Sequence, residues 1–366
     1  MFTGAVDQYG KPFVACHWFT FRLQLVLFDG SIHPTISNDH HQHAAVSMAT
    51  PVLFGFLAMF AEDMYTEGAL LPPADPRIAA AGWDIVGYLT ANDVLIPEPG
   101  AADRRLTVDR SQRVFYGFLA KSRMDPASFV VAVRGTDGLV EWLIDAEFLL
   151  IKHPIYPTTQ VEQGFWGVYQ SMNLVDAATG AVINAKAAQG IAATVVGATV
   201  TITGHSLGSA LATYLTLDVA VTLGSGVTAC LFASPRTGDA AWAALFDKTV
   251  TNYQLYNYIL DLVTHVPGLG YATLSKAAVL QPATAQANIR LDVFCNHHVI
   301  CYCAMIDYAA AMAAPTTPGD VKCELCISPP PMSEATKGLA ALINEFGIGD
   351  EKTLAMLKAL HKISAV

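Results

Sequence analysis

From residue 114 onward, short runs of β-branched and aromatic residues alternate with longer stretches of helical periodicity. The runs that predict strands are 114–119, 129–133, 199–203, 228–232 and 252–258. The stretches that predict helices are 164–178, 183–193 and 207–223, the last followed by a glycine that can end it. Strands joined by helical connections are typical of parallel sheets with crossover helices. We therefore expect an α/β fold, with a mostly parallel central sheet and helices on both faces.

The two ends of the chain have less regular patterns. An apolar helical stretch, 52–64, follows an irregular beginning, and a Pro-rich segment follows Ala314. Beyond that segment, two amphipathic stretches near 334–346 and 351–362 predict a helical hairpin. We therefore expect three parts, which are an N-terminal extension (1–50), an α/β domain (51–314) and a linker with a C-terminal helical hairpin (315–366).

Composition and charge exclude several classes of protein. Hydrophobic residues make up 53% of the chain and charged residues 14%, which indicates a large folded core. The net charge of −10 argues against binding to nucleic acids and against electrostatic docking on anionic membranes. We also expect no transmembrane segment, because no run reaches about 18 apolar residues. No secretory signal is visible, and the compartment stays open.

A five-residue segment, Gly204-His205-Ser206-Leu207-Gly208, carries the strongest chemical signal. The pattern G-x-S-x-G is common by itself, so its surroundings decide its meaning. Here a β-branched run precedes it and a helical pattern begins at Leu207, which is the strand, sharp turn and helix of a nucleophile elbow. The glycines leave room for the tight turn. Ser206 is therefore the candidate nucleophile, and the backbone N–H of Leu207 is a candidate oxyanion donor.

A serine hydroxyl needs a histidine to accept its proton and a carboxylate to orient that histidine. When such sites occur in α/β-hydrolases, the acid and then the histidine follow the serine in the chain. Asp261 follows a predicted strand and begins a turn, whereas Asp218 lies inside the helix after the elbow. The adjacent pair His297 and His298 provides the best base candidates. The other downstream histidines are His265, in the turn of Asp261, and His361, in the terminal helix.

Several separate segments together resemble the class 3 lipase family, over about residues 54–309. In the family's order, they are Val131 to Thr136 for F-R-G-[ST], Trp142 with Asp145 for W-x-x-D, Val161 to Phe165 for V-H-x-G-F, Gly204 to Ala210 for G-H-S-L-G-G-A, Ser234 to Gly238 for S-P-R-V-G, and Asp261 to Pro267 for D-x-V-x-x-x-P. The resemblance implies an α/β-hydrolase fold and a lipid-hydrolysing activity. The chain departs from the motifs at Val133, Glu162 and Ser209, which leaves the subfamily open.

The resemblance also implies roles for particular residues. Thr136 would be the second oxyanion donor, beside Leu207. His297 is preferred over His298 as the base, because in many relatives a tyrosine follows the histidine by five positions, as Tyr302 does here. Relatives often cover the site with a mobile lid, and the apolar stretch 138–148 occupies that place, although a buried surface helix would explain it equally well.

We therefore expect a carboxylic ester hydrolase, most simply a lipase that acts on acylglycerols through Ser206, His297 and Asp261. Its partner would be a lipid or small ester, with transient contact to a lipid interface, and the reaction needs no cofactor or metal. A short-chain carboxylesterase and a phospholipase are alternatives within the same class. A catalytically inactive relative that binds a partner is a further alternative.

A metal-binding or interaction module is the alternative outside this class. Two features suggest it, the cluster His40, His41 and His43, and the Cys-x-x-Cys spacing of Cys323 and Cys326. The cluster is more simply read as a solvated loop. The seven cysteines are too sparse for a disulfide scaffold, and we expect most of them to be free thiols in apolar surroundings.

Overall fold

The computed structural model describes residues 50–66, 69–92, 113–136, 148–314, 326–328 and 341. All of them lie in one unit of the chain, Val46–Val366. The predicted N-terminal extension, the candidate lid and the C-terminal hairpin fall almost wholly outside the described residues, and so does the histidine cluster near residue 40. The division into three parts therefore stays a prediction.

The main sheet of the described region has nine strands, in the order β11-β10-β9-β8-β3-β2-β1-β6-β7. In that order the strands are β11 (Ala277–Leu280), β10 (Tyr253–Tyr258), β9 (Val227–Phe232), β8 (Thr199–His205), β3 (Ser128–Val133), β2 (Arg113–Ser122), β1 (Trp83–Asn92), β6 (Asn173–Asp176) and β7 (Val182–Asn184). The five from β11 to β3 are parallel, and the remaining neighbours pair antiparallel. The predicted α/β fold is confirmed, with an antiparallel half that the sequence pattern did not predict.

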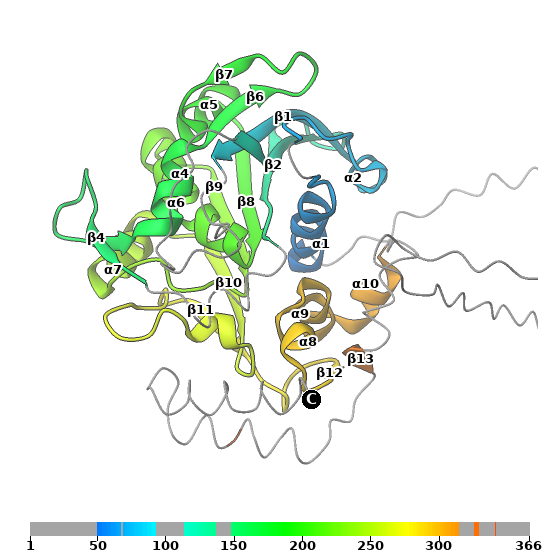
Figure 1. Ribbon diagram of the computed structural model, residues 1–366. Helices are drawn as coiled ribbons and strands as arrows, with labels where there is room; N and C mark the ends of the chain where they lie inside the picture. The colour runs from blue at the N-terminus through cyan, green and yellow to red at the C-terminus, as the bar shows by residue number, and fades with distance from the viewer. Residues whose placement is uncertain are drawn as a thin grey trace, which may run out of the picture. The chain divides into compact units, whose positions relative to one another are not determined.

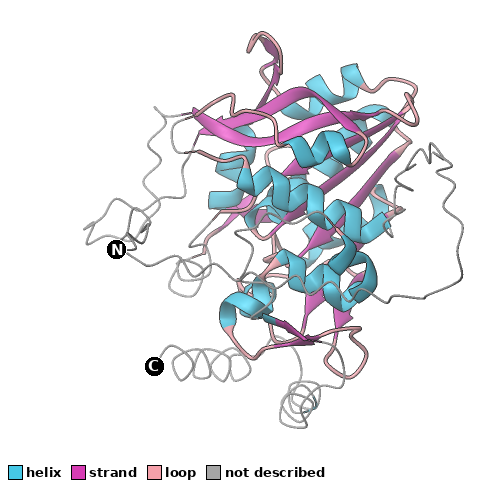
Figure 2. Ribbon diagram, turned by 90° about the vertical axis from the view of Figure 1, so that its right-hand side faces the viewer, coloured by secondary structure: helices cyan, strands magenta, loops and turns pink. Residues whose placement is uncertain are grey.

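Helices cover both faces of this sheet (Figures 1 and 2). On one face lie α4 (Gln163–Ser171), α5 (Ala187–Thr194), α6 (Leu207–Leu223) and α7 (Ala240–Thr249), and on the other lie α1 (Thr50–Asp63), α8 (Val293–His297), α9 (Val299–Ile306) and α10 (Tyr308–Ala313). Each layer encloses its own hydrophobic cluster against the sheet, and α6 is buried along most of its length. Among the described residues, no helix is long and apolar enough to cross a lipid bilayer.

Smaller elements complete the described structure. They are α2 (Pro76–Ala80), β4 (Leu150–Lys152), β5 (Gln160–Glu162), the 3₁₀ turn η1 (Leu262–His265), β12 (Asn288–Ile289) and β13 (Ile327–Ser328). The strands β4 and β5 form a hairpin, and β12 pairs with β13. The hairpin precedes α4 directly, so it fixes where the chain enters the helical layer.

The predicted helix 207–223 matches α6, which ends at Gly224 in the left-handed conformation (φ 74°). The predicted helix 164–178 is wrong in its second half, because the chain becomes extended at Met172 and enters β6. There Leu174 and Val175 pair with β1, and this tertiary pairing overrides the helical spacing. The predicted helix 183–193 likewise begins as strand β7.

Two cysteines form a disulfide, Cys295 with Cys326, across 31 residues. The bond joins α8 to the start of β13. The hypothesis that Cys323 and Cys326 form a metal-binding pair is therefore wrong, because Cys326 is bonded to Cys295, outside that motif. Cys230, Cys301 and Cys303 are buried thiols, as expected of cysteines in apolar surroundings.

His153 is a buried imidazole in the β4–β5 hairpin. Its ring stacks on Trp242 at a centroid distance of 5.5 Å, and its Nδ1 accepts the backbone N–H groups of Ile155 and Tyr156, both at 3.1 Å. Burial lowers the pKa of His153 from its ordinary value to about 4. The folded protein therefore holds this ring neutral, as the two accepted hydrogen bonds require.

We expect His153 to make stability depend on pH below neutrality. Because its folded pKa is depressed, its contribution is complete above about pH 6.5 and is lost as the pH falls toward 4, by up to about 3 kcal/mol. In His153→Asn the side-chain oxygen can still accept the turn N–H groups, but it does not titrate. Urea unfolding between pH 7 and pH 4 should show a steeper loss in the wild type than in the variant. Equal slopes would contradict this account.

Candidate active site

Ser206 lies in the turn between β8 and α6. Its backbone has φ 58° and ψ −127°, a conformation that a residue with a Cβ rarely adopts. Its N–H donates to the carbonyl of Phe232, the last residue of β9, at 3.1 Å. A strained serine between a parallel strand and a helix is the nucleophile elbow that the sequence predicted.

The two glycines of the motif are required by close backbone contacts. A Cβ built on Gly204 would lie 2.4 Å from the carbonyl oxygen of Gly208. A Cβ on Gly208 would lie 2.2 Å from the carbonyl oxygen of Val133, at the end of β3. Any larger residue would push α6 away from β8 and β3, so these positions hold the elbow against the sheet.

Three predicted residues come together at the carboxyl ends of the parallel strands. Oγ of Ser206 lies 2.7 Å from Nε2 of His297, and Nδ1 of His297 lies 2.8 Å from Oδ2 of Asp261. Ser206 follows β8, Asp261 follows β10, and His297 ends α8. The exposed fractions of these residues are 2%, 1% and 7%, so the charges that develop here are poorly screened by water.

Tyr302 on α9 orients the acid and determines the tautomer of the histidine. Its hydroxyl accepts the backbone N–H of Tyr258 at 2.8 Å and donates to Oδ2 of Asp261 at 2.7 Å. Oδ1 of Asp261 accepts the N–H of Val263 at 2.9 Å. The carboxylate accepts at both oxygens, so Nδ1 of His297 carries its proton toward Asp261. Nε2 is then free to accept the proton of Ser206.

Burial, and then the charge of Asp261, raise the pKa of Tyr302 well above its ordinary value. The phenol therefore stays protonated over the whole physiological range and remains a donor. In the sequence, Tyr302 marks only the spacing from His297, and its contact with Asp261, 41 residues away, has no signal in the chain.

The rival candidates have other partners. Nδ1 of His298 accepts the N–H of Ile300 at 3.3 Å, which caps the start of α9. Nε2 of His265 lies 3.0 Å from the carbonyl of Ile259. Asp218 accepts a hydrogen bond from the hydroxyl of Tyr169, on the helical layer. His361 lies outside the described residues.

The segment that follows β3 runs beside the elbow and ends at Thr136. Arg134 is 1% exposed and holds this segment through bonds from Nη1 to the carbonyl of Gly135 (2.9 Å) and to Oγ1 of Thr136 (3.1 Å). A Cβ on Gly135 would lie 3.0 Å from the carbonyl of His205, which shows how closely the segment approaches the elbow. Because Oγ1 of Thr136 accepts from Arg134, the Thr136 hydroxyl proton is available to another acceptor.

A second histidine, His205, lies behind the first. Its ring centroid is 4.7 Å from that of His297, and its Nδ1 lies 2.9 Å from Oε1 of Glu62 on α1. Neither residue is among the candidates that the sequence indicates. His205 sits inside the recognised motif, but Glu62 is a single acid in an apolar helical stretch and lies 143 residues away.

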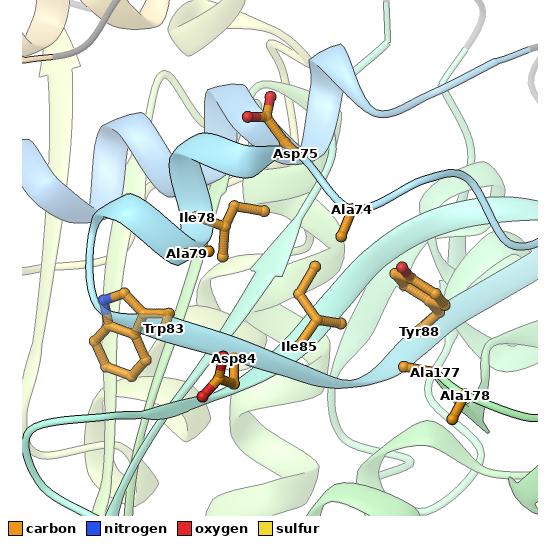
Figure 3. Close-up of a pocket in the computed structure, with 10 residues that line it drawn as sticks. All are labelled: Ala74, Asp75, Ile78, Ala79, Trp83, Asp84, Ile85, Tyr88, Ala177 and Ala178. Carbon is orange, nitrogen blue, oxygen red and sulfur yellow. The ribbon is translucent and has the colours of Figure 1, made fainter.

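A hollow of about 310 Å³ lies elsewhere, between α2 and β1 (Figure 3). Its walls include Ile78, Trp83, Ile85 and Tyr88, and none of the three aligned residues above borders it. The two carboxylates at its rim already pair with arginines, Asp75 with Arg77 and Asp84 with Arg123. The hollow is therefore separate from the Ser206 site.

Within the described ranges, no group of three or more His, Cys, Asp or Glu side chains has the arrangement of a metal site. The histidine cluster near residue 40 and Cys323 lie outside those ranges. The groups aligned on Ser206 are instead a hydroxyl, an imidazole and a carboxylate, which suits proton transfer and nucleophilic attack.

A parallel sheet with a nucleophile elbow, followed along the chain by an acid and a histidine, defines an α/β-hydrolase. Residues 130–271 match the family model described as Lipase (class 3). This stretch contains the Thr136 segment, the elbow and Asp261. The resemblance to class 3 lipases that the motifs indicate is therefore confirmed.

Curated relatives of this chain include plant phospholipases A1. The chain is 31% identical over 165 residues to phospholipase A(1) DAD1, chloroplastic, of Arabidopsis thaliana, covering 40% of this chain and 35% of that protein. It is 28% identical over 221 residues to phospholipase A1-II 6 of Oryza sativa subsp. japonica, covering 52% and 53%. The chain thus spans about a third to a half of the length of these relatives.

Solved structures similar to this chain include fungal lipases. One is a Rhizomucor miehei lipase propeptide complex, with a TM-score of 0.43, 19% identity, and coverage of 63% of this chain and 68% of that one. Another, described as a triacylglycerol lipase whose catalytic centre is a serine protease triad, has a TM-score of 0.45, 17% identity, and coverage of 63% and 79%.

We expect Tyr302→Phe to weaken both stability and activity. The change leaves the N–H of Tyr258 without its acceptor and removes one donor from Asp261, at a cost of about 1–3 kcal/mol in the free energy of unfolding. Urea unfolding and kcat measured on the same preparations test this. The matched control is Tyr256→Phe on β10, whose hydroxyl bonds only the exposed Gln254 side chain. Equal losses in the two variants would contradict a special role for Tyr302.

Proposed function

We propose that this protein hydrolyses carboxylic esters of lipids, with Ser206 as nucleophile, His297 as general base and acid, and Asp261 as the group that orients the histidine. The continuous hydrogen-bonded line from Ser206 Oγ through His297 to Asp261 Oδ2 carries the proposal. Thr136 and Leu207 supply the oxyanion donors. Leu207 is suited to this because it begins α6, where the first N–H groups have no partner within the helix.

The reaction has two halves. In the first, Oγ of Ser206 bonds to the ester carbonyl carbon while its proton moves to Nε2 of His297, and the carbonyl oxygen becomes an oxyanion at Thr136 and Leu207. As the carbon–oxygen bond to the alcohol breaks, His297 returns the proton to that alcohol. In the second half, His297 takes a proton from water, the hydroxide attacks the acyl carbon, and Ser206 leaves with that proton. The products are an alcohol and a carboxylic acid.

Acylglycerols are the substrate class we propose first, in line with the class 3 lipase match over residues 130–271. A phospholipid is the second candidate, and a specific observation favours it, since curated relatives at 28–32% identity are described as phospholipases A1. Both substrates present an acyl ester of glycerol to the same serine. They differ in the head group, so the two candidates share the chemistry and differ in specificity.

Replacing the nucleophile tests the mechanism. We expect Ser206→Ala to lower kcat for a p-nitrophenyl ester by about 10⁴- to 10⁶-fold and to abolish labelling by an organophosphonate probe. Ser209→Ala is the matched control, because Ser209 is equally buried and lies on the first turn of α6 without a described bond to His297. A Ser206→Ala protein that kept its ester hydrolysis would refute the assignment.

A substrate panel tests the specificity. We expect fatty acid release from emulsified triacylglycerol, measured by titration, alongside cleavage of long-chain p-nitrophenyl esters. Release from phosphatidylcholine vesicles with triacylglycerol untouched would favour the phospholipase candidate instead. Cleavage of short p-nitrophenyl esters alone would favour a carboxylesterase.

A further inference from the structure

The carboxylate of Glu62 lies beside the site without belonging to the line of Ser206, His297 and Asp261. It is carried by α1, which packs against α9, β8 and β3 (Figure 1). A single atom, Oε1, accepts the backbone N–H of Gly135 at 3.1 Å and lies 2.9 Å from Nδ1 of His205. A Cβ on Gly135 would lie 2.4 Å from the same oxygen, so the carboxylate fills the space that this glycine leaves.

The partners of His205 require protons on both of its ring nitrogens. Nε2 lies 2.6 Å from the carbonyl oxygen of His297, which can only accept, so Nε2 must donate. Nδ1 faces Oε1 of Glu62, which already accepts the N–H of Gly135. A carboxylate oxygen can only accept, so Nδ1 donates as well, and a ring that donates from both nitrogens is an imidazolium. The two side chains therefore form an ion pair.

The pKa directions of the two groups agree with this. Burial by itself would raise the pKa of Glu62, but the charge and hydrogen bond of His205 hold it below its ordinary value. Burial by itself would lower the pKa of His205, but Glu62 holds it above its ordinary value. Both shifts favour the charged form of each group, in agreement with the hydrogen-bond geometry of the pair.

The three backbone segments that this pair joins each carry one part of the site. His205 immediately precedes Ser206, and Gly135 immediately precedes Thr136. The carbonyl that accepts from His205 belongs to His297 itself. One ion pair thus connects the nucleophile, the oxyanion segment and the base.

We propose that the Glu62–His205 ion pair positions groups for catalysis: it holds the His297 backbone and the Thr136 segment at fixed distances from Ser206. This inference rests on the proposed function, because it assigns the pair to the same reaction. Neither residue is placed in contact with the substrate, so the pair acts through the groups it holds.

A neutral glutamine at position 62 would disrupt this arrangement in a pH-dependent way. The atom in the place of Oε1 must accept from Gly135, so it cannot also donate to a neutral His205. A neutral His205 must then give up one of its two contacts. A charged His205 would be uncompensated, 4.7 Å from the ring of His297, and would oppose the positive charge that His297 gains in the reaction. The described titratable groups that face His205 are Glu62 on α1, Asp261 after β10, His297 on α8 and Tyr302 on α9, and His298 acts on Glu62.

The test is the pH profile of Glu62→Gln with p-nitrophenyl butyrate. We expect kcat at pH 8 to fall by about 10- to 100-fold, with KM changed less than about twofold, because a shift of the reacting groups by about 1 Å can cost 10²-fold. Because the variant lacks the carboxylate that holds up the pKa of His205, its His205 loses the second proton at a lower pH than in the wild type. The ratio of variant to wild-type kcat should therefore change with pH.

Asp63→Asn is the matched control, because it removes a carboxylate from the next position of α1, where Asp63 pairs with Arg77 away from the site. It should keep the wild-type pH profile. An unchanged kcat and pH profile in Glu62→Gln would overturn the positioning role. So would a loss in Glu62→Gln that is the same at every pH, since that is expected of a purely structural defect.

A measurement on the unmodified protein separates this inference from the proposed function. In a pH titration of ¹⁵N-histidine-labelled wild type followed by NMR, the ring of His205 should keep both N–H protons above about pH 6.5, the ordinary pKa of histidine. A His205 that is already neutral at pH 6.5 would overturn the ion pair, whether or not Glu62→Gln folds. Absence of ester hydrolysis in the wild type would refute the proposed function, and the NMR result would still decide the charge state of the pair.

Discussion

The backbone of Ser206, with φ 58°, is the constraint on which the rest of the site depends. Such a turn costs roughly 1–3 kcal/mol and persists only if its surroundings hold it. Gly204 and Gly208 allow β8, α6 and β3 to approach within backbone contact, and the Ser206 N–H is tied to β9. The buried helix α6 anchors the other side of the turn. Three parallel strands, β8, β3 and β9, thus support one strained residue, whose hydroxyl consequently projects from the carboxyl edge.

Two hydrogen-bonded lines meet at His297. One runs from the N–H of Tyr258 through Tyr302 and Asp261 to the His297 side chain. The other runs from Gly135 through Glu62 and His205 to the His297 backbone carbonyl. The first determines the tautomer of the ring, and the second restrains the chain that carries the ring. Each buried polar group in these lines finds a partner, which a low-dielectric surrounding demands.

Local features of the sequence were the most predictable. The strand, elbow and helix from residue 199 to 223 were predicted almost to the residue, because turn chemistry and helical periodicity act over a few residues. The antiparallel half of the sheet was less accessible. Residues after Met172 have helical spacing, yet they form β6 because pairing with β1 buries Leu174 and Val175. A strand is stabilised by the strands that pair with it, and the local sequence pattern does not show which distant segment will pair.

By itself, therefore, the sequence determined the α/β class, the nucleophile candidate and the order of serine, acid and histidine. Family motifs added Thr136 and a preference for His297. Only the tertiary structure decided that His297 faces Ser206 while the adjacent His298 caps α9, because neighbouring side chains at a helix junction point in different directions. It alone brought Glu62 and Tyr302 into the site, and it paired Cys326 with Cys295. These contacts join residues 31 to 143 positions apart, and periodicity along the chain carries no information about such distances.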